Sequence, residues 1–332
     1  MKNILIIHTG GTFGMTPVLP SMTLKPGNIK ADIEKYLPLL KDIAHIHFNI
    51  PFNLDSSNIS PDEWLKIFSI IKIEQDHYDG FVIIHGTDTL VYTAAALSYL
   101  LIGLRKPIIL TGAQRPLSAI RSDARGNLIN AVELATFPIP EVAICFGNKL
   151  LRGNRTKKLS MESYAGFESP NYPELASIGL NIQLHPHNFL NSKQRSLLKP
   201  VFDSGLMVIQ IYPGLEPELY RFVFNTAVRA ILLLGYGVGN LPNPRPNWLK
   251  FIAALLDAGK LVFIGSQSLH GQVDMHLYEF GKQAEKSGCI SLQDMTTEAA
   301  LVKLMLLLGN FNDPHLIKKY FSLPLAGELG AE

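Results

Sequence analysis

The sequence carries no excess of charge of either sign: in 332 residues, 30 lysines and arginines stand against 28 aspartates and glutamates, a formal net charge of +2. Proteins that hold a phosphate backbone present a concentrated basic surface, so no nucleic-acid partner is expected. The uncharged stretch near the middle of the chain, Thr89–Leu104, is shorter than the about 20 mostly apolar residues of a membrane span. No membrane association is expected either.

Cysteine is scarce, and no secretion signal is visible. A signal peptide needs an apolar region of about 7–15 residues, whereas the N-terminus offers only the aliphatic run Ile4–Ile7 before polar and glycine residues. The two cysteines, Cys145 and Cys289, both lie in apolar runs. We therefore expect a cytoplasmic protein in which both thiols are reduced core residues.

Sequence motifs of metal binding, nucleotide binding and serine hydrolases are also missing. The ten histidines give only two close pairs, His45 with His47 and His185 with His187, and neither has the spacing of a helical zinc motif or a cysteine nearby. No metal site is expected. The dinucleotide fingerprint, the phosphate loop and the nucleophile elbow of serine hydrolases are absent as well.

The chain is rich in apolar residues: hydrophobic side chains make up 47% of it, enough for large buried cores. Short β-branched runs alternate with stretches of helical spacing, a pattern typical of α/β folds with mostly parallel strands. We expect strands at 3–8, 81–85, 107–110, 142–146, 206–212, 230–234 and 261–265. Helices are expected at 61–75, 90–103, 121–137, 216–225, 247–258, 275–287 and 297–308.

The length favours two domains. The alternation lapses in a polar stretch with proline near both ends, which predicts a linker at residues 185–204. We therefore expect a larger N-terminal catalytic α/β domain at 1–184, with a mostly parallel sheet flanked by helices. A smaller C-terminal α/β domain is expected at 205–332.

Ligands of open α/β sheets bind where strands end and lead into helices. Small and hydroxyl residues gather after three of the expected strands, in the segments His8-Thr9-Gly10-Gly11-Thr12, His85-Gly86-Thr87-Asp88-Thr89 and Thr111-Gly112-Ala113-Gln114. Each has an ordinary explanation too: the paired glycines suit a tight turn, and Asp88 suits a helix N-cap. Lys158, farther along, suits a solvated loop.

These segments could together support the chemistry of a threonine. A threonine hydroxyl becomes a nucleophile when a neighbouring base takes its proton. Thr12, Thr87, Asp88 and Lys158 are the residue types required, because burial lowers the pKa of a lysine and an adjacent carboxylate can hold it in place. The sequence shows that these residues are available, and their convergence is a hypothesis.

Taken together, the motifs resemble those of the bacterial-type L-asparaginases. They follow the family's order as Thr9–Thr12 (TGGT), His85–Thr89 (HGTDT), Thr111–Pro116 (TGAQRP) and Tyr236–Asn240 (YGVGN). Asp55-Ser56-Ser57 and the segment Arg152–Lys158 look like the cytoplasmic type I branch. The resemblance covers the chain from Lys2 to about Leu323. It implies an amidohydrolase that converts L-asparagine, and L-glutamine more weakly, without a cofactor, in a homodimer or homotetramer.

The resemblance also implies roles for individual residues. Thr12 matches the nucleophile that forms a β-aspartyl-enzyme intermediate. Thr87, Asp88 and Lys158 match a second cluster, in which the lysine moves a proton and Thr87 holds the attacking water. Asp88 would also bind the substrate's α-ammonium and Ser56 its α-carboxylate. The implied substrate contacts are Asp55, Ser56, Ser57, Thr87, Asp88 and Ala113, with the backbone at Ala113 and Thr87 donating to the oxyanion.

Two positions depart from the family. Met22 aligns with a loop tyrosine that the family places beside the nucleophile, and a thioether cannot replace a phenol in proton transfer. Either another group, such as Tyr236, assists Thr12, or acylation is slow. Leu234 aligns with an arginine of a regulatory asparagine site found in some type I enzymes, so we expect that regulation to be absent or differently built.

Two alternatives remain. The chain could be a non-catalytic or very slow amino-acid binding protein that retains the asparagine pocket, as the missing tyrosine would allow. It could also be the amidase-like subunit of a transfer-RNA-dependent amidotransferase. We discount the second, because that subunit carries an extra N-terminal domain whereas TGGT begins here at Thr9.

Overall fold

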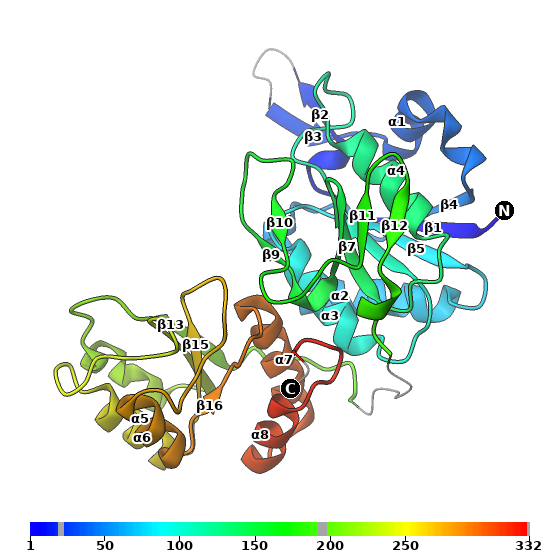
Figure 1. The fold of residues 1–332 in the computed structure, drawn as a ribbon. Coiled ribbons are helices and arrows are strands. Elements are labelled where there is room, and N and C mark those ends of the chain that lie inside the picture. The colour runs from blue at the N-terminus through cyan, green and yellow to red at the C-terminus, as the bar shows by residue number, and fades with distance from the viewer. Residues whose placement is uncertain (19–22, 192–197, 331–332) are drawn as a thin grey trace. The chain divides into compact units, whose positions relative to one another are not determined.

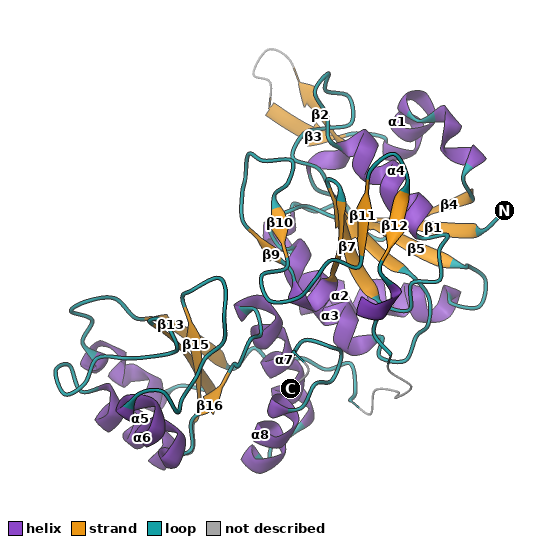
Figure 2. Ribbon diagram, in the orientation of Figure 1, coloured by secondary structure: helices purple, strands orange, loops and turns teal. Residues whose placement is uncertain are grey.

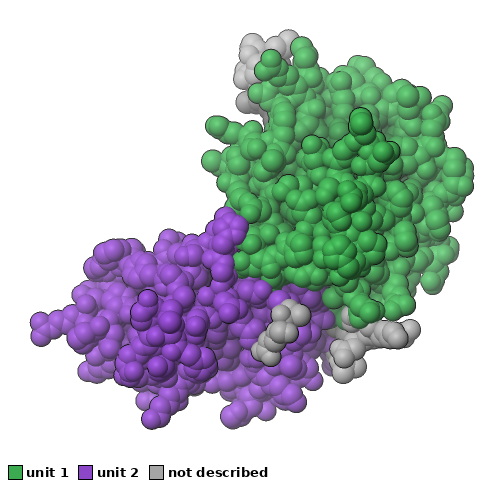
Figure 3. All heavy atoms as spheres, viewed as in Figure 1, with its two compact units in different colours: residues 1–197 green, residues 198–332 purple. Residues whose placement is uncertain are grey.

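The computed structural model describes residues 1–18, 23–191 and 198–330. The chain divides into two compact units, residues 1–197 and residues 198–332 (Figure 3). Each unit is described by itself. Met22 and residues 192–197 of the expected linker lie outside the described residues.

A mixed sheet of eight strands forms the centre of unit 1, in the order β12-β11-β8-β7-β6-β5-β1-β4 (Figure 1). Its strands are β1 (Asn3–His8), β4 (His45–Asn49), β5 (Gly80–Ile84), β6 (Ile108–Thr111), β7 (Val142–Phe146), β8 (Lys149–Arg152), β11 (Ala176–Ile178) and β12 (Ile182–Leu184). Strands β7, β6, β5, β1 and β4 run parallel, whereas β8, β11 and β12 add antiparallel pairs at one side. The expected mostly parallel sheet is confirmed.

Helices cover both faces of this sheet (Figure 2). Because successive strand residues point to opposite faces, Ile4 and Ile6 of β1 pack in one core with α1 (Ile29–Tyr36) and α4 (Ala124–Leu134). Leu5 and Ile7 pack in the other core with α2 (Pro61–Glu74) and α3 (Leu90–Leu100). Because both faces of the sheet are buried under helices, the strands are continuous apolar runs in the sequence. Two short pairs complete the unit, β2 (Met15–Val18) with β3 (Thr23–Pro26) and β9 (Lys157–Lys158) with β10 (Phe167–Glu168).

A buried ion pair fixes the chain just before β9. The Arg152 Nε atom donates to Oε2 of Glu141 at 2.6 Å, and the two side chains are only 5% and 3% exposed. The other carboxylate oxygen of Glu141 accepts from the backbone N–H of Leu190, and the guanidinium lies 4.2 Å from the ring centroid of Tyr172. The turn that leads to Lys158 thus starts from an anchored residue.

Unit 2 contains a parallel sheet of four strands in the order β13-β14-β15-β16. Its elements are β13 (Leu206–Gln210), β14 (Ala230–Gly235), β15 (Leu261–Ser266), β16 (Ile290–Ser291), α5 (Trp248–Asp257), α6 (Glu279–Ser287), α7 (Thr297–Asn310) and α8 (Pro314–Ser322). The helix expected at 216–225 is a 3₁₀ helix at residues 217–225. Its buried side chains, Pro217 and Val223, are six positions apart, which is two turns of a three-residue helix.

Candidate active site

The loops that follow β1 and β5 touch through their backbones. Gly11 has a φ of +81°, and a Cβ at this position would lie 2.4 Å from the Cα of Gly86. Gly10 has a φ of +118°, and a Cβ there would lie 2.1 Å from the carbonyl oxygen of Leu54. Neither position has room for a side chain. The paired glycines therefore do more than make a tight turn, because they let the ends of neighbouring segments meet.

Hydrogen bonds hold the loop after β1 to both neighbours. The Leu54 N–H donates to the Thr9 carbonyl at 3.0 Å, and the Gly11 N–H donates to the Leu54 carbonyl at 3.1 Å. The hydroxyl and the N–H of Thr9 each donate to the carbonyl of Ile84 at 3.0 Å. Thr12 follows Gly11 directly and is partly exposed. Its loop is thereby fixed against the loop that carries Thr87.

A lysine from a distant part of the chain joins the loop after β5. The Lys158 ammonium donates to the Thr87 hydroxyl at 2.9 Å and to Oδ1 of Asp88 at 2.6 Å. The Lys158 side chain is 16% exposed, whereas that of Asp88 is 65% exposed. Lys158 is therefore not a solvated loop lysine. Asp88 is not a helix cap either, because the N-cap of α3 is Thr89.

The segment after Leu54 contributes a buried hydroxyl. Ser56 is 3% exposed, and its Oγ accepts from the N–H of Asp88 at 3.3 Å. The Ser56 carbonyl accepts from the Thr89 hydroxyl at 2.7 Å. A serine hydroxyl that accepts one hydrogen bond still has its own proton to donate. Ser56 can therefore bind an anionic group beside Asp88.

Asp55 and Ser57, which flank Ser56, bond to each other. Oδ1 of Asp55 accepts from both the N–H and the hydroxyl of Ser57 at 2.8 Å. The backbone bond, followed by the hydroxyl bond, lowers the pKa of Asp55 below its ordinary value. This carboxylate is ionised at neutral pH and caps the turn that presents Ser56.

The loop after β6 carries Ala113, which is 2% exposed. A Cβ on the neighbouring Gly112 would lie 2.5 Å from the carbonyl oxygen of His85, so this loop packs closely on the loop after β5. Two residues at the start of α4, Asp123 and Asn127, bond to it. They were not predicted from the sequence, where the available signal was an acid and an amide four residues apart at a helix start.

His85, which directly follows β5, is a structural residue. Its Nδ1 atom lies 2.7 Å from the Gly86 carbonyl oxygen, and Nε2 lies 2.9 Å from the Thr93 hydroxyl. A carbonyl can only accept, so Nδ1 carries the proton and Nε2 accepts from Thr93. Burial, only partly offset by the bond to Gly86, lowers the pKa of His85 to about 4. The neutral ring supports the loop and does not serve as a base.

We expect these buried histidines to make the protein acid-sensitive. Burial lowers the pKa of both His8 and His85 from 6.5 to about 4, so protons bind the unfolded chain first. The stabilisation is complete above about pH 6.5 and is lost as the pH falls towards 4, by about 2 kcal/mol per histidine between pH 7 and pH 5. Urea unfolding of the parent and His85→Gln at both pH values tests this. The variant should lose less stability, and equal losses would contradict the assignment.

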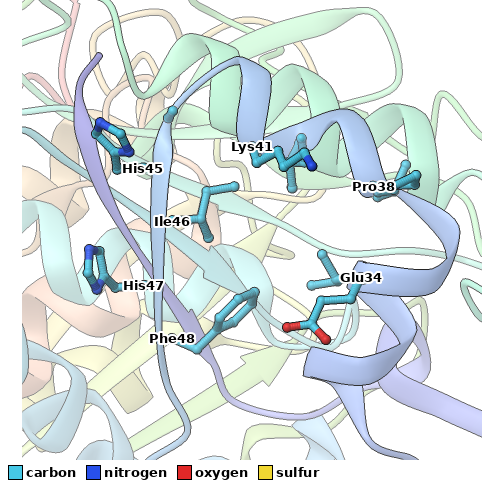
Figure 4. Close-up of a pocket in the computed structure, with 11 residues that line it drawn as sticks. Glu34, Pro38, Lys41, His45, Ile46, His47 and Phe48 are labelled. Atoms are coloured by element: carbon cyan, nitrogen blue, oxygen red, sulfur yellow. The ribbon is translucent and has the colours of Figure 1, made fainter.

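A cavity of 520 Å³ lies elsewhere in unit 1, between α1, the turn Pro38–Asp42 and β4 (Figure 4). Ile46 and Phe48 extend into it from β4, and Glu34 and Lys41 stand at its helical side (Figure 4). None of the predicted site residues lines it. Among the described residues, no group of three or more histidine, cysteine, aspartate or glutamate side chains could hold a metal ion. No helix in the same ranges is long and apolar enough to cross a membrane.

Comparison with known protein families shows which family has this sequence and these loops. The family described as "Asparaginase, N-terminal" matches residues 3–189, and "Glutaminase/Asparaginase C-terminal domain" matches residues 206–321.

The chain belongs to the asparaginase family.

Its relatives in the asparaginase family match it over nearly the whole length. L-asparaginase 1 of Escherichia coli is 38% identical over 334 residues, which cover 99% of this chain and 98% of that protein. The solved structure of the thermostable L-asparaginase from Thermococcus kodakarensis has a TM-score of 0.89 at 34% identity and covers 99% of this chain and 100% of that one. A component of the glutamyl-tRNA(Gln) amidotransferase of Sulfolobus acidocaldarius is 32% identical over 99% of this chain, but the match covers only 76% of that protein.

These matches confirm the resemblance inferred from the TGGT, HGTDT and YGVGN motifs, and the assignment to the amidohydrolases of the asparaginase family. They also confirm the fold class, an α/β protein with a larger mixed sheet followed by a smaller parallel one.

Proposed function

We propose that this asparaginase-family protein hydrolyses L-asparagine to L-aspartate and ammonia, with Thr12 as the nucleophile. The observation that carries the proposal is the bonding of the Lys158 ammonium to the Thr87 hydroxyl and the Asp88 carboxylate. This cluster adjoins the contact between Gly11 and Gly86, which sets the Thr12 loop against it. The names of the full-length relatives support the same reaction.

In the first half of the reaction, the Thr12 oxygen attacks the side-chain carbonyl carbon of asparagine. The proton of its hydroxyl passes to the departing nitrogen, which leaves as ammonia, and a β-aspartyl ester remains. The negative charge that develops on the carbonyl oxygen needs fixed donors, since these act only in the transition state. The backbone at Ala113 and Thr87 supplies them.

In the second half, water attacks the ester and releases aspartate. Thr87 holds the water, and the hydrogen-bonded path from Thr87 to Lys158 moves the water's proton back to the Thr12 oxygen. Lys158 suits this role because it is mostly buried but bonded to a carboxylate. No cofactor is required for either step.

The two charged ends of the substrate meet complementary groups. The exposed carboxylate of Asp88 can bind the α-ammonium, and the Ser56 hydroxyl can donate to the α-carboxylate. Asp55 and Ser57 shape the turn that presents Ser56. L-glutamine is a weaker substrate in this proposal, since its extra methylene moves the amide away from Thr12.

Ammonia release from L-asparagine and from L-glutamine tests the function. We expect Thr12→Ala to lose nearly all activity, by about 10³-fold or more, because no other hydroxyl replaces the nucleophile. Thr12→Ser keeps a hydroxyl and is the control that should retain measurable turnover. A parent protein that binds asparagine without releasing ammonia would contradict the proposal and favour the alternative of a non-catalytic binding protein.

Location and assembly complete the proposal. We propose a cytoplasmic homodimer or homotetramer that acts on free amino acids and on neither nucleic acid nor membranes. One relative supports the location: a solved structure of a probable cytoplasmic L-asparaginase from Campylobacter jejuni is 28% identical to this chain. Light scattering of the purified protein tests the assembly.

We expect the rate to depend on asparagine concentration without cooperativity. Leu234 lies in β14 and packs its side chain against the apolar core of unit 2, so it cannot bind a carboxylate. A regulatory site that needs an arginine here has no cation at this position. Steady-state rates over a wide range of asparagine concentrations should fit a Hill coefficient of about one. A coefficient clearly above one would show that a regulatory site is built differently.

A further inference from the structure

We propose that Asn127 and Asp123, at the start of α4, are positioning residues that hold the peptide groups on both sides of Ala113 in the orientation that the reaction needs. The inference rests on the proposed function, in which the backbone at Ala113 donates to the oxyanion. It adds two side chains that do not touch the substrate but decide where that backbone points.

Asn127 ties the loop after β6 to the helix behind it. The residue is 2% exposed, and its Nδ2 atom donates to the Gly112 carbonyl at 2.9 Å and to Oδ2 of Asp123 at 3.2 Å. Its Oδ1 atom accepts from the N–H of Gly147 at 3.0 Å. One buried amide therefore joins the loop after β6 to the loop after β7. Buried amides with this many bonds tolerate little movement.

Asp123 holds the other side of Ala113. It is the N-cap of α4, yet its side chain makes no capping bond to the helix. Its carboxylate instead accepts from the N–H of Gln114 at 2.9 Å and from that of Arg115 at 3.0 Å. A capping carboxylate normally satisfies the first helical N–H groups. The Ser122 hydroxyl accepts from the Ala124 N–H at 3.1 Å instead, so the Asp123 carboxylate is available to hold the loop.

These bonds fix the direction of both Ala113 peptide groups. In a planar trans peptide the C=O and the N–H point in opposite directions. Since the Gly112 carbonyl points to Asn127, the Ala113 N–H points away from α4. Since the Gln114 N–H points to Asp123, the Ala113 carbonyl points away from α4 as well. On the other side, Gly112 packs against the His85 carbonyl, so the loop is held between α4 and the loop of Thr87.

The test compares two substitutions in the same helix. Asn127→Asp keeps the size and the acceptor for Gly147 but loses the donor to Gly112. We expect kcat for asparagine to fall by at least about 10-fold while KM stays within about threefold, because a misdirected oxyanion donor affects the transition state more than ground-state binding. Asn130→Asp is the matched control, since the Asn130 amide donates to the Gly147 carbonyl instead of to the Ala113 loop. We expect its kcat to stay near that of the parent.

A double variant separates positioning from stability. In Asp123→Asn with Asn127→Asp, an amide and a carboxylate again face each other, so Tm should return towards the parent value. The Gly112 carbonyl still lacks its donor, so kcat should stay low. If kcat recovers together with Tm, the two residues only stabilise the fold and the inference is overturned.

Hydrogen exchange tests the positioning role without a measurement of activity. The amides of residues 112–115 should exchange faster in Asn127→Asp than in the parent, and unchanged exchange would overturn the inference whatever the activity. An active parent with an equally active Asn127→Asp would overturn it as well and leave the proposed function intact. A parent that releases no ammonia removes the proposed function first, and the positioning role with it.

Discussion

Replacement of Lys158 by methionine is expected to lower kcat for asparagine hydrolysis by about 10³-fold, within the range typical of a lost proton-transfer group. The substitution keeps an unbranched stem of similar length but removes the terminal nitrogen that bonds to both Thr87 and Asp88. Without it, the path that carries the water's proton on from Thr87 is interrupted, and the Asp88 carboxylate loses its cation. Initial rates of ammonia release at saturating asparagine measure the effect.

Lys158→Arg distinguishes proton transfer from charge. A guanidinium stays protonated at all accessible pH values but still attracts Asp88. We expect this variant to bind asparagine with a KM near that of the parent and to show a kcat almost as low as that of Lys158→Met. If its kcat lies within about tenfold of the parent, the charge of the lysine matters and its proton does not.

The second large effect concerns stability. We expect Glu141→Ala to lower the free energy of unfolding by about 3–5 kcal/mol, because it leaves the Arg152 guanidinium buried without its carboxylate. The pair is almost fully enclosed, and the same carboxylate also holds the N–H of Leu190. Urea denaturation at pH 7, followed by circular dichroism, measures the loss.

The double variant Glu141→Leu with Arg152→Met is the control for this prediction. Apolar residues of similar size often replace a buried ion pair with little or no loss of stability. We therefore expect the double variant to be clearly more stable than Glu141→Ala. If it is equally unstable, the loss of stability comes from the missing hydrogen bonds between these side chains and the backbone. It then does not come from the buried, uncompensated charge of Arg152.

The central part of the fold could be predicted from the sequence because continuous apolar strands alternate with helices along it. The expected strand at 3–8 and the expected helix start at Pro61 match the structure residue for residue. Both are marked by strong local signals, a continuous apolar run and a Ser60–Glu63 capping box. The antiparallel strands β8, β11 and β12 escaped prediction because runs of four and three residues carry no readable periodicity.

The candidate site, too, could be predicted from the sequence only in part. Thr12 and Thr87 directly follow glycines at strand ends, and Asp88 follows Thr87, where topology alone suggests a ligand. Lys158 was available by residue type, but its place in the cluster came from the family resemblance, because no local pattern predicts that a lysine 70 residues beyond Asp88 bonds to it. Asn127 could not be recognised, since its role depends on which carbonyl its amide reaches after folding.

The contact between Gly11 and Gly86 has a consequence for how this site can change. A Cβ at Gly11 would lie 2.4 Å from the Cα of Gly86, and a Cβ at Gly86 would lie 2.6 Å from the Oγ of Ser56, so neither position has room for another amino acid. The loops that carry Thr12 and Thr87 are therefore as close together as two main chains in van der Waals contact can be. Evolution or a protein engineer can alter what surrounds the substrate, but a wider gap between these loops requires the whole β1–β5 junction to be rebuilt.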